Sequence, residues 1–425
     1  MSRLTHPIHD FRYKGGELYC EGVPVASIIR KTGTPAYIYS HQTLVGHYRK
    51  IAAAFKSLDP VICFAMKANG NLAVLRALAR EGAGFDIVSG GELRKARMIG
   101  ADMQKVAFAS VGKTEEEILL AIRAGILLFN VESVPELVNI NRLAGKMRKT
   151  VRVALRINPD IDAPTHEKIN TGSLRKKFGI DLKTARGIFL DRKAYPSLCI
   201  NGIHIHIGSQ ITRGEPFVAA IRKALAFMDD LALKGVVIEY LDIGGGLGII
   251  YKDEAPQTAL EYARKVMPLL KGRALQLVME PGRFIVGNAG IFVTRKLYTK
   301  DNGLKKFMIV DAGMNDLVRP SMYGAHHEII PVVKSAARKI VCDVVGPVCE
   351  SADVFAHDRE VADIKDGALL ALLSAGAYGY AMASNYNARP RAVEVMVKGT
   401  RWDVIRARET FRDLVRGSFI PEYLK

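Results

Sequence analysis

Short apolar runs alternate with longer amphipathic stretches along the chain as far as Gly290. The eight apolar runs are Val61–Met66, Phe85–Val88, Val106–Ala109, Ile126–Val131, Val151–Ile157, Ile200–Ile207, Ile238–Ile243 and Leu275–Glu280. Such nearly continuous runs are typical of strands that are buried on both faces. The amphipathic segments are Leu72–Glu81, Glu92–Ile99, Glu115–Ala124, Val134–Leu143, Leu182–Leu190, Pro216–Leu233 and Ala259–Leu270. The alternation predicts parallel pairing in a closed (β/α)8 barrel, with an open doubly wound sheet as the alternative.

After Gly290 the pattern changes to short strand-like runs without long helices between them. These runs are Ile291–Tyr298, Phe307–Asp311, Ile340–Val345, Ala368–Ser374 and Val393–Val397. They predict an antiparallel β-domain. The first residues, including Phe11–Tyr13 and Glu17–Cys20, are also strand and turn in character, and a helix is expected over His41–Phe55.

We therefore expect an α/β protein with two domains. A (β/α)8 TIM barrel is expected over residues 37–286. A discontinuous antiparallel β-barrel or sandwich is expected over residues 287–425, completed by the N-terminal segment of residues 1–36. The length of 425 residues is comfortable for two domains.

Composition adds an excess of basic residues to this picture. There are 61 Lys and Arg against 43 Asp and Glu, a formal charge of +18, while 49 % hydrophobic residues exclude a mainly disordered chain. The charges are scattered, with the densest stretch at Lys168–Lys193, and the single Trp402 offers little for base stacking. A solvated basic surface is the favoured interpretation, and a nucleic-acid binder is the alternative.

The five cysteines are an odd number without a CxxC pair, which indicates neither a disulfide framework nor a zinc site. Residues 1–10 lack the apolar core of a signal peptide, and no run of 18 uncharged apolar residues occurs. We therefore expect a cytoplasmic protein without membrane spans.

A lysine follows the first apolar run, in the sequence Ala65-Met-Lys-Ala-Asn69. The active site of a (β/α)8 barrel lies at the C-terminal ends of its strands. Desolvation at such a position lowers the pKa of a lysine and makes the amine nucleophilic, as Schiff-base chemistry requires. A snorkelling surface lysine is the structural alternative for Lys67.

Other polar residues also stand where apolar runs end. Asp86 lies in the second run and Arg156 near the end of the fifth, and we expect both at strand ends. His204 and His206 share a strand face, which can suit a metal, but no carboxylate accompanies them in the sequence. The Gly-Ser turn after them suits an anion better, so we expect no metal.

Glycine-rich turns follow the last two runs, as Gly244-Gly-Gly246 and Glu280-Pro-Gly-Arg283. Successive glycines let backbone N–H groups approach an anion closely. The spacing differs from the dinucleotide GxGxxG pattern, because Ile249 stands where the last glycine is required. Loops after strands 7 and 8 of such barrels frequently bind phosphate.

Together these features indicate a phosphorylated cofactor that carries an aldehyde, and pyridoxal 5′-phosphate (PLP) fits. Lys67 forms the Schiff base, the glycine loop holds the phosphate, and an acid at a strand end keeps the pyridine nitrogen protonated.

The sequence resembles the PLP-dependent amino-acid decarboxylases of the alanine-racemase-like fold, and among them the diaminopimelate decarboxylases. The motifs that carry the resemblance run in the family's order over nearly the whole chain. They are Phe64-Ala-Met-Lys-Ala-Asn69, His204-Ile-His-Ile-Gly-Ser-Gln210, Gly244-Gly-Gly246, Glu280-Pro-Gly-Arg283, Arg319-Pro-Ser-Met-Tyr323, Cys349-Glu-Ser-Ala-Asp353 and Gly376-Ala-Tyr-Gly379. The segment His166–Ile180 also resembles these enzymes, although the family usually has a small or polar residue where Lys176 stands.

The resemblance implies roles around the cofactor. Lys67 would carry the Schiff base, His206 would stack on the pyridine ring, and Glu280 would pair with the pyridinium. The phosphate would be bound by Ser209, Gly245 and Gly246, with Gly282, Arg283 and Tyr378 nearby. Asp86 and Arg156 would support the lysine and the cofactor.

The resemblance also implies how the substrate is bound. Arg283, Arg319 and Tyr323 would hold its distal carboxylate, with Tyr378 beside it. Cys349 and Glu350 would come from the second subunit of a homodimer, Cys349 as the proton donor and Glu350 reading the distal ammonium. The implied reaction converts meso-2,6-diaminopimelate to L-lysine and CO₂, the last step of lysine biosynthesis.

Glu280 favours decarboxylation over racemisation, because an arginine there would weaken the electron sink. An arginine or ornithine decarboxylase on the same fold is the first alternative. Arginine residues suit a substrate that keeps a second carboxylate, which ornithine lacks. A regulator that has lost catalysis is a further alternative, and the presence of Lys67, Glu280 and Cys349 argues against it.

Overall fold

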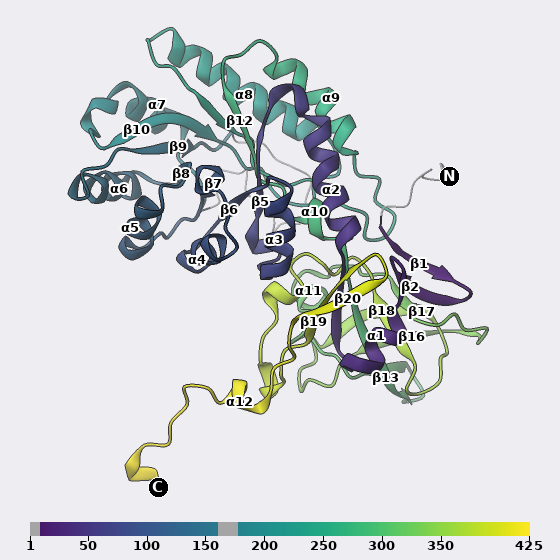
Figure 1. Cartoon of the computed structure of the whole chain (residues 1–425). Helices are drawn as coiled ribbons and strands as arrows, with labels where there is room; N and C mark the ends of the chain where they lie inside the picture. The colour runs from purple at the N-terminus through teal and green to yellow at the C-terminus, as the bar shows by residue number, and fades with distance from the viewer. Residues whose placement is uncertain (1–8, 160–176) are drawn as a thin grey trace. The chain divides into compact units, whose positions relative to one another are not determined.

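The computed structural model describes residues 9–159 and 177–425 (Figure 1). Contacts divide the chain into two compact units, residues 44–286 and residues 1–43 with 287–425. The part of the decarboxylase-like segment from His166 to Lys176 lies outside the described residues.

Eight parallel strands form a closed barrel in the unit of residues 44–286, with helices around them (Figure 1). Around the ring the strands are β10 (Leu198–His204), β11 (Tyr240–Asp242), β12 (Gln276–Met279), β5 (Val61–Ala65), β6 (Gly84–Ile87), β7 (Val106–Phe108), β8 (Leu128–Val131) and β9 (Val151–Arg156). Each neighbouring pair is parallel. The closed ring confirms the (β/α)8 prediction and excludes the open sheet.

Except for the short last one, α10, the helices of this unit follow the predicted segments. They are α2 (His41–Ala54), α3 (Leu72–Arg80), α4 (Gly90–Met98), α5 (Glu115–Ala124), α6 (Val134–Lys146), α7 (Leu182–Leu190), α8 (Glu215–Ala232), α9 (Ala259–Leu270) and α10 (Arg283–Val286), with 3-10 turns η1 (Lys56–Leu58), η2 (Met66–Ala68), η3 (Met103–Lys105) and η5 (Arg192–Ala194). Capping boxes start α5 at Thr114 and α9 at Thr258, each cap contributing about 1 kcal/mol. Among the described helices, none is long and apolar enough to cross a membrane.

The second unit is built on a nine-stranded sheet. Its main path runs β17 (Val354–Ala362), β16 (Lys339–Val345), β14 (Lys306–Val310), β13 (Gly290–Asp301), β4 (Ala36–Ser40), β19 (Val393–Lys398) and β20 (Arg401–Arg406), and β18 (Leu369–Leu372) pairs with β13 and with β15 (Ile329–Pro331). Its helices and 3-10 turns are α1 (Val25–Thr32), α11 (Arg319–Tyr323), α12 (Phe411–Leu414), η6 (Tyr380–Met382), η7 (Tyr386–Ala388) and η8 (Glu422–Leu424). Most pairs are antiparallel, as predicted, but β14 pairs with β16 and β19 with β4 in parallel.

The N-terminal segment packs against this sheet. A small antiparallel sheet of β1 (Phe11–Lys14), β2 (Glu17–Cys20) and β3 (Val23–Pro24) and helix α1 share one apolar core with strands β4, β13 and β19. Strand β4 spans residues 36 and 37, where the barrel domain is predicted to begin. It pairs with β13 and β19 of the sheet, and the two compact units divide after Thr43.

Four strands of the sheet, β4, β15, β17 and β20, have no counterpart among the predicted runs. Strand β4 is short and fully buried, whereas β17 and β20 end the path of the sheet. Strand β17 reads Val-Phe-Ala-His-Asp-Arg-Glu-Val-Ala, and β20 is polar and mostly exposed. A strand near the edge of a sheet exposes much of its surface to water, so the apolar run that marks a buried strand is missing.

Candidate active site

Polar side chains collect inside the barrel where its strands end. Small and apolar residues of five barrel strands pack in one cluster, which includes Cys63, Ala107, Leu128, Ala154 and Val278. Two positions beyond Leu128, Ala154 and Val278 stand Asn130, Arg156 and Glu280. Because side chains alternate along a strand, these polar groups share the inward face and form the next layer toward the C-terminal ends.

Lys67 lies on η2, directly after β5, and its amine contacts Asp86 on β6. The distance from Nζ to Oδ2 is 2.5 Å, and the carboxylate is fully buried while the lysine side chain is 39 % exposed. Burial raises the pKa of Asp86 to about 7, and the charge of Glu280 adds to the rise. The structure therefore places a carboxyl that titrates near neutrality beside the predicted nucleophile.

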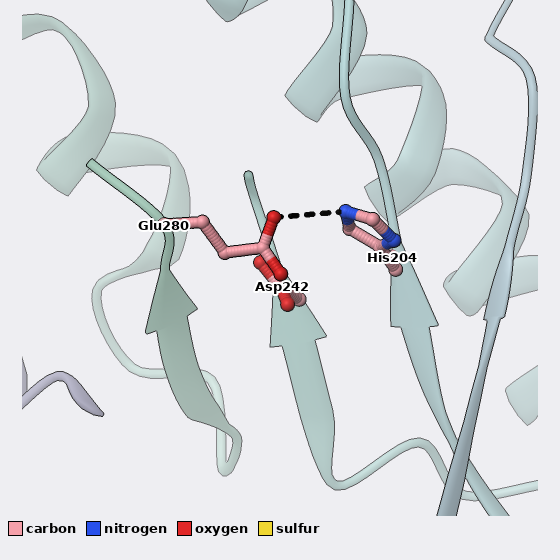
Figure 2. A group of neighbouring side chains, drawn as sticks. All are labelled: His204, Asp242 and Glu280. Carbon is pink, nitrogen blue, oxygen red and sulfur yellow. Dashed lines mark ion pairs between the residues drawn. The ribbon is translucent and has the colours of Figure 1, made fainter. Parts of the chain in front are cut away.

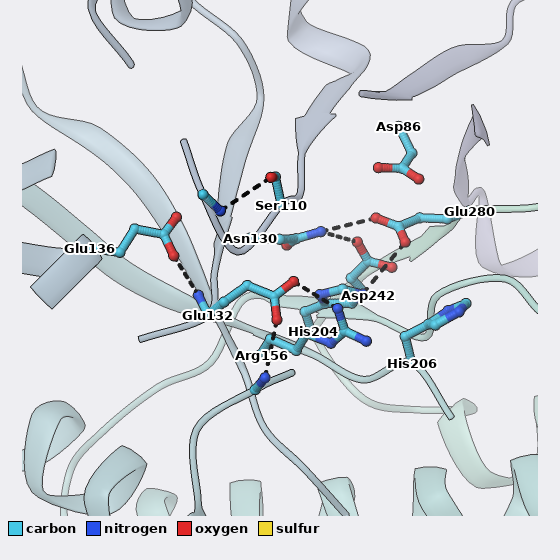
Figure 3. A network of polar contacts seen from close by, with 12 residues as sticks. Asp86, Ser110, Asn130, Glu132, Glu136, Arg156, His204, His206, Asp242 and Glu280 are labelled. Atoms are coloured by element: carbon cyan, nitrogen blue, oxygen red, sulfur yellow. Dashed lines mark hydrogen bonds and ion pairs between the residues drawn. The ribbon is translucent and has the colours of Figure 1, made fainter. Parts of the chain in front are cut away.

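A second cluster of polar side chains surrounds Glu280, the residue that follows β12. Its Oε2 lies 3.5 Å from Nε2 of His204 on β10 (Figure 2). Asn130 on β8 donates from Nδ2 to Oε1 of Glu280 at 2.9 Å and to Oδ2 of Asp242 at 3.0 Å (Figure 3). All four side chains are buried, so the barrel interior holds two carboxyl groups bridged by one amide.

The two carboxyl groups differ in charge. Burial raises the pKa of Asp242 well above its ordinary value, and the neighbouring Glu280 raises it further. Burial also opposes ionisation of Glu280, but the interaction with His204 and the charge of Lys67 outweigh it and lower the pKa of Glu280. The two shifts therefore favour the ionised form of Glu280 and the protonated form of Asp242.

His204, Asp242 and Glu280 each offer a possible metal ligand, and the three atoms lie within 4.8 Å of one another. The expectation that no carboxylate accompanies the histidines is wrong. The two acids come from neighbouring strands, far away in the sequence, so the spacing of the histidines could not reveal them.

His206 carries a neutral ring at the end of β10. Burial lowers the pKa of His206 well below its ordinary value, and Arg156 and Lys67 lower it further. The N–H of Gly245 donates to Nδ1 of His206 at 3.3 Å, which assigns the proton of the neutral ring to Nε2.

The glycine loop after β11 leaves no room for side chains. A Cβ on Gly245 would lie 2.1 Å from the carbonyl oxygen of Glu280, and one on Gly246 would lie 2.5 Å from that of Gly208. Gly244 and Gly246 also have φ of +66° and +101°, where side chains are strained. This backbone forms a close-fitting cradle of the kind that binds phosphate.

The remaining predicted cofactor residues surround the same strand ends. Arg283, the first residue of α10, donates to Oγ of Ser209 at 3.1 Å and to the Tyr251 hydroxyl at 2.6 Å. A Cβ on Gly282 would meet Ala65 and Ala68 at 3.1 Å each, so glycine lets this turn pack against the end of β5.

Arg156 is fixed by a buried ion pair. Its Nη1 lies 2.7 Å from Oε1 of Glu132, whose Oε2 accepts from the N–H of Gly179 at 3.0 Å (Figure 3). The N–H of Glu132 donates in turn to Glu136, the partner of the buried Lys113. Arg156 is therefore held by its surroundings, which suits a supporting role.

These groups fit PLP. The barrel end offers an amine on Lys67, an ionised acid on Glu280, a flat neutral ring on His206 and the glycine cradle. In the described part of the chain, Oδ1 of Asp86, Oδ1 of Asn130 and Nδ1 of His204 are buried without a hydrogen-bond partner. Buried polar atoms of this kind call for a polar partner.

The comparisons with known proteins agree with this donor set. Residues 42–287 match the family model described as "Pyridoxal-dependent decarboxylase, pyridoxal binding domain". The diaminopimelate decarboxylase of Aquifex aeolicus is 46 % identical over 407 residues, 96 % of each chain.

Solved structures give the same result. Diaminopimelate decarboxylase from Helicobacter pylori, complexed with L-lysine, superposes with a TM-score of 0.89 at 39 % identity, covering 92 % of this chain and 98 % of that one. The enzyme from M. jannaschii, in co-complex with L-lysine, gives a TM-score of 0.93 at 37 % identity, covering 98 % and 99 %. This chain belongs to the diaminopimelate decarboxylase family.

The other residues that the resemblance singles out lie in the unit of residues 1–43 and 287–425. Arg319 begins α11 and is buried, and its Nη1 lies 2.8 Å from Nε2 of His327. Nδ1 of His327 lies 2.8 Å from the carbonyl oxygen of Leu373, so it donates there and Nε2 accepts from Arg319. Tyr323 ends the same helix and is half-buried.

Cys349 and Glu350 are both exposed, and the N–H of Cys349 donates to Oδ1 of Asn387 at 2.9 Å. Tyr378 is half-buried with φ of +57°, which is unusual for a residue with a side chain. The roles of these residues in this family member remain predictions.

The sequence analysis missed Asn130, Glu132, Asp242 and Lys113. Asn130 and Glu132 are two positions apart at the end of β8, and Asp242 ends β11, so a signal was available. Polar residues spaced by two at the end of a buried strand indicate an inward polar layer.

Replacing Gly245 by Ala should damage the cradle, because the new Cβ overlaps the carbonyl oxygen of Glu280. We expect a loss of about 1–3 kcal/mol in the free energy of unfolding, together with weaker PLP binding. Gly187→Ala is the matched control, since Gly187 lies in α7 and a Cβ there meets nothing within 4 Å. Denaturant unfolding and PLP titration of both variants measure the difference, and equal behaviour would refute the cradle.

Replacing Asp86 by Asn should change the pH dependence of stability of the PLP-free protein. Because the pKa of Asp86 is raised from 3.8 to about 7, the unfolded state loses this proton first, and the parent loses stability as the pH rises through that window. The Tm difference in favour of Asp86→Asn should grow between pH 3.8 and about 7 and then stay constant. A difference independent of pH would show that Asp86 titrates normally.

Proposed function

We propose that this protein decarboxylates meso-2,6-diaminopimelate to L-lysine and CO₂ with PLP, as the last step of lysine biosynthesis. The observation that carries the proposal is the buried Glu280, with its lowered pKa, in the same barrel end as Lys67 and the glycine cradle. An anion keeps a proton on a pyridine nitrogen, whereas a cation would not.

When bound, PLP supplies an aldehyde that joins the amine of the substrate and a ring that takes up the electron pair released with CO₂. Lys67 is the amine that holds this aldehyde between turnovers. Its ammonium must first lose a proton, and Oδ2 of Asp86, 2.5 Å away with a pKa of about 7, is placed to accept it. With PLP bound, Glu280 would hold the proton of the ring nitrogen, and the neutral ring of His206 would cover one face of the cofactor.

Recognition of diaminopimelate requires groups for a distal carboxylate and a distal ammonium. Arg319, with its guanidinium oriented by His327, and Arg283 supply cations for the carboxylate, with Tyr323 and Tyr378 beside it. Glu350 supplies the negative charge that binds the distal ammonium of the substrate. Arginine and ornithine lack the distal carboxylate, so this set of side chains favours diaminopimelate over both.

The site is shared between two subunits in this proposal. Cys349 and Glu350 of one subunit complete the barrel of the other, and Cys349 gives its thiol proton to the α-carbon after CO₂ has left. The exposure of both side chains supports contact with a second copy. All five cysteines are free, which supports the expected cytoplasmic location.

The purified protein loaded with PLP should release CO₂ from meso-diaminopimelate and not from arginine or ornithine at equal concentration. Lys67→Ala should abolish both CO₂ release and the visible absorbance of the lysine-bound cofactor, because the reacting amine is removed. CO₂ release coupled to a colorimetric assay, with an absorption spectrum of each protein, measures both. Preference for ornithine would establish the alternative function, and a retained visible band in Lys67→Ala would refute the cofactor assignment.

Cys349→Ala should slow turnover about 10²-fold or more, the usual scale for the loss of a general acid, with PLP binding unchanged. Cys199→Ala is the control, because Cys199 is partly buried at the start of β10, away from the strand ends. A mixture of Lys67→Ala and Cys349→Ala subunits should regain activity that neither variant has alone, since mixed dimers contain one intact site. No recovery after reassociation would argue against a shared site.

A further inference from the structure

The side chain of Asn130 bridges two carboxyl groups inside the barrel. It lies on β8, opposite β12 in the ring, and its amide reaches across the interior to two carboxyl groups (Figure 3). Nδ2 donates to Oε1 of Glu280 at 2.9 Å and to Oδ2 of Asp242 at 3.0 Å. An amide nitrogen carries two hydrogens, so both are used by the acid pair.

The backbone of Asn130 is itself held in place. Its carbonyl oxygen accepts a hydrogen bond of 2.8 Å from Nζ of Lys113, which also contacts the carbonyl oxygen of Ser110 at 2.9 Å and Oε1 of Glu136 at 2.6 Å. The ammonium of Lys113 is fully buried. Because the strand is fixed on this side, the Asn130 amide meets the carboxyl groups in a prepared geometry, at little cost in conformational entropy.

The other contacts of the pair distinguish its two members. Asp242 also accepts from the N–H of Gly244 at 2.9 Å, so it is tied to the start of the glycine cradle. Glu280 has His204 at 3.5 Å. Two buried carboxylates joined through one amide repel each other if both are charged, and one retained proton relieves this repulsion.

We propose that Asn130 and Asp242 are positioning residues for Glu280: Asn130 fixes the carboxylate, and Asp242 keeps the proton of the pair so that Glu280 remains the anion. This inference rests on the proposed function, in which Glu280 faces the ring nitrogen of PLP. It adds that two neighbouring side chains hold this acid in position and favour its ionised form.

The sign of the pH effect follows from the groups that face Glu280. In the described chain these groups are His204, Asp242, Lys67, Asp86, His206 and Cys63. His204 and Lys67 lower the pKa of Glu280, while burial opposes them. Loss of the Asn130 hydrogen bond removes a further stabilisation of the anion, so Glu280 should accept a proton at a higher pH.

The test compares Asn130→Leu with the parent holoenzyme. Leucine has a similar size but no donor, so the affinity of the apoenzyme for PLP should fall about 10- to 100-fold, as expected for a lost hydrogen bond to a charged group. The acid-side midpoint of the visible absorbance of the holoenzyme should move to higher pH. Both readouts concern the cofactor site rather than turnover.

Asn201→Leu is the matched control. Asn201 lies on the same barrel, buried on β10, and donates from Nδ2 to Oε2 of Glu239 at 2.9 Å. It should lose the same type of bond without a change in the absorbance midpoint. If Asn130→Leu does not fold, Asn130→Ser is the substitute. The serine side chain is too short to reach either carboxyl group, so both readouts should shift in the same direction.

Asp242→Asn separates the two parts of the proposal. An amide imitates a protonated carboxyl group, so the acid-side midpoint should stay at that of the parent. A change as large as that of Glu280→Gln would show that Asp242 is needed as an anion and would overturn the assignment of the proton. A parent-like Asn130→Leu beside an impaired Glu280→Gln would overturn only the positioning role, whereas a parent-like Glu280→Gln would overturn the proposed function itself.

Discussion

An ionised carboxylate enclosed in the barrel is the constraint around which this site is organised. Burying such a charge without partners costs several kcal/mol. Here Glu280 has an amide from β8, an imidazole from β10 and the field of Lys67, while Asp242 beside it stays neutral. Each partner comes from a different strand, so the charge is stabilised only when the ring is closed.

The same closure prepares the rest of the site. The carbonyl group of Glu280 lies where Gly245 has no Cβ, so the strand end that carries the acid also shapes the glycine cradle. The N–H of Gly245 then fixes the neutral tautomer of His206. The acid, the anion cradle and the ring that covers the cofactor are therefore coupled through backbone contacts between β10, β11 and the end of β12.

Much of the fold could be predicted from the chain because its parallel strands are buried on both faces. Each of the eight apolar runs overlaps a barrel strand, and Lys67 and Glu280 stand at strand ends as expected. The prediction was less complete for the sheet unit, where β17 and β20 are polar and two pairs are parallel. The active site does not account for the excess of basic residues over acidic ones. Only four basic residues have proposed roles in the site: Lys67, Arg156, Arg283 and Arg319.

By itself, the sequence determined the order of strands and helices, the lysine, the glycine turns and the acid, because local periodicity and short motifs encode them. Only the tertiary structure decided which polar groups meet. Asn130 and Asp242 are separated by 112 positions, and Asn130 and Glu280 by 150, yet they are joined by hydrogen bonds. Contacts across a closed ring depend on strand register and barrel closure, so no local pattern could assign the proton to Asp242 and the charge to Glu280.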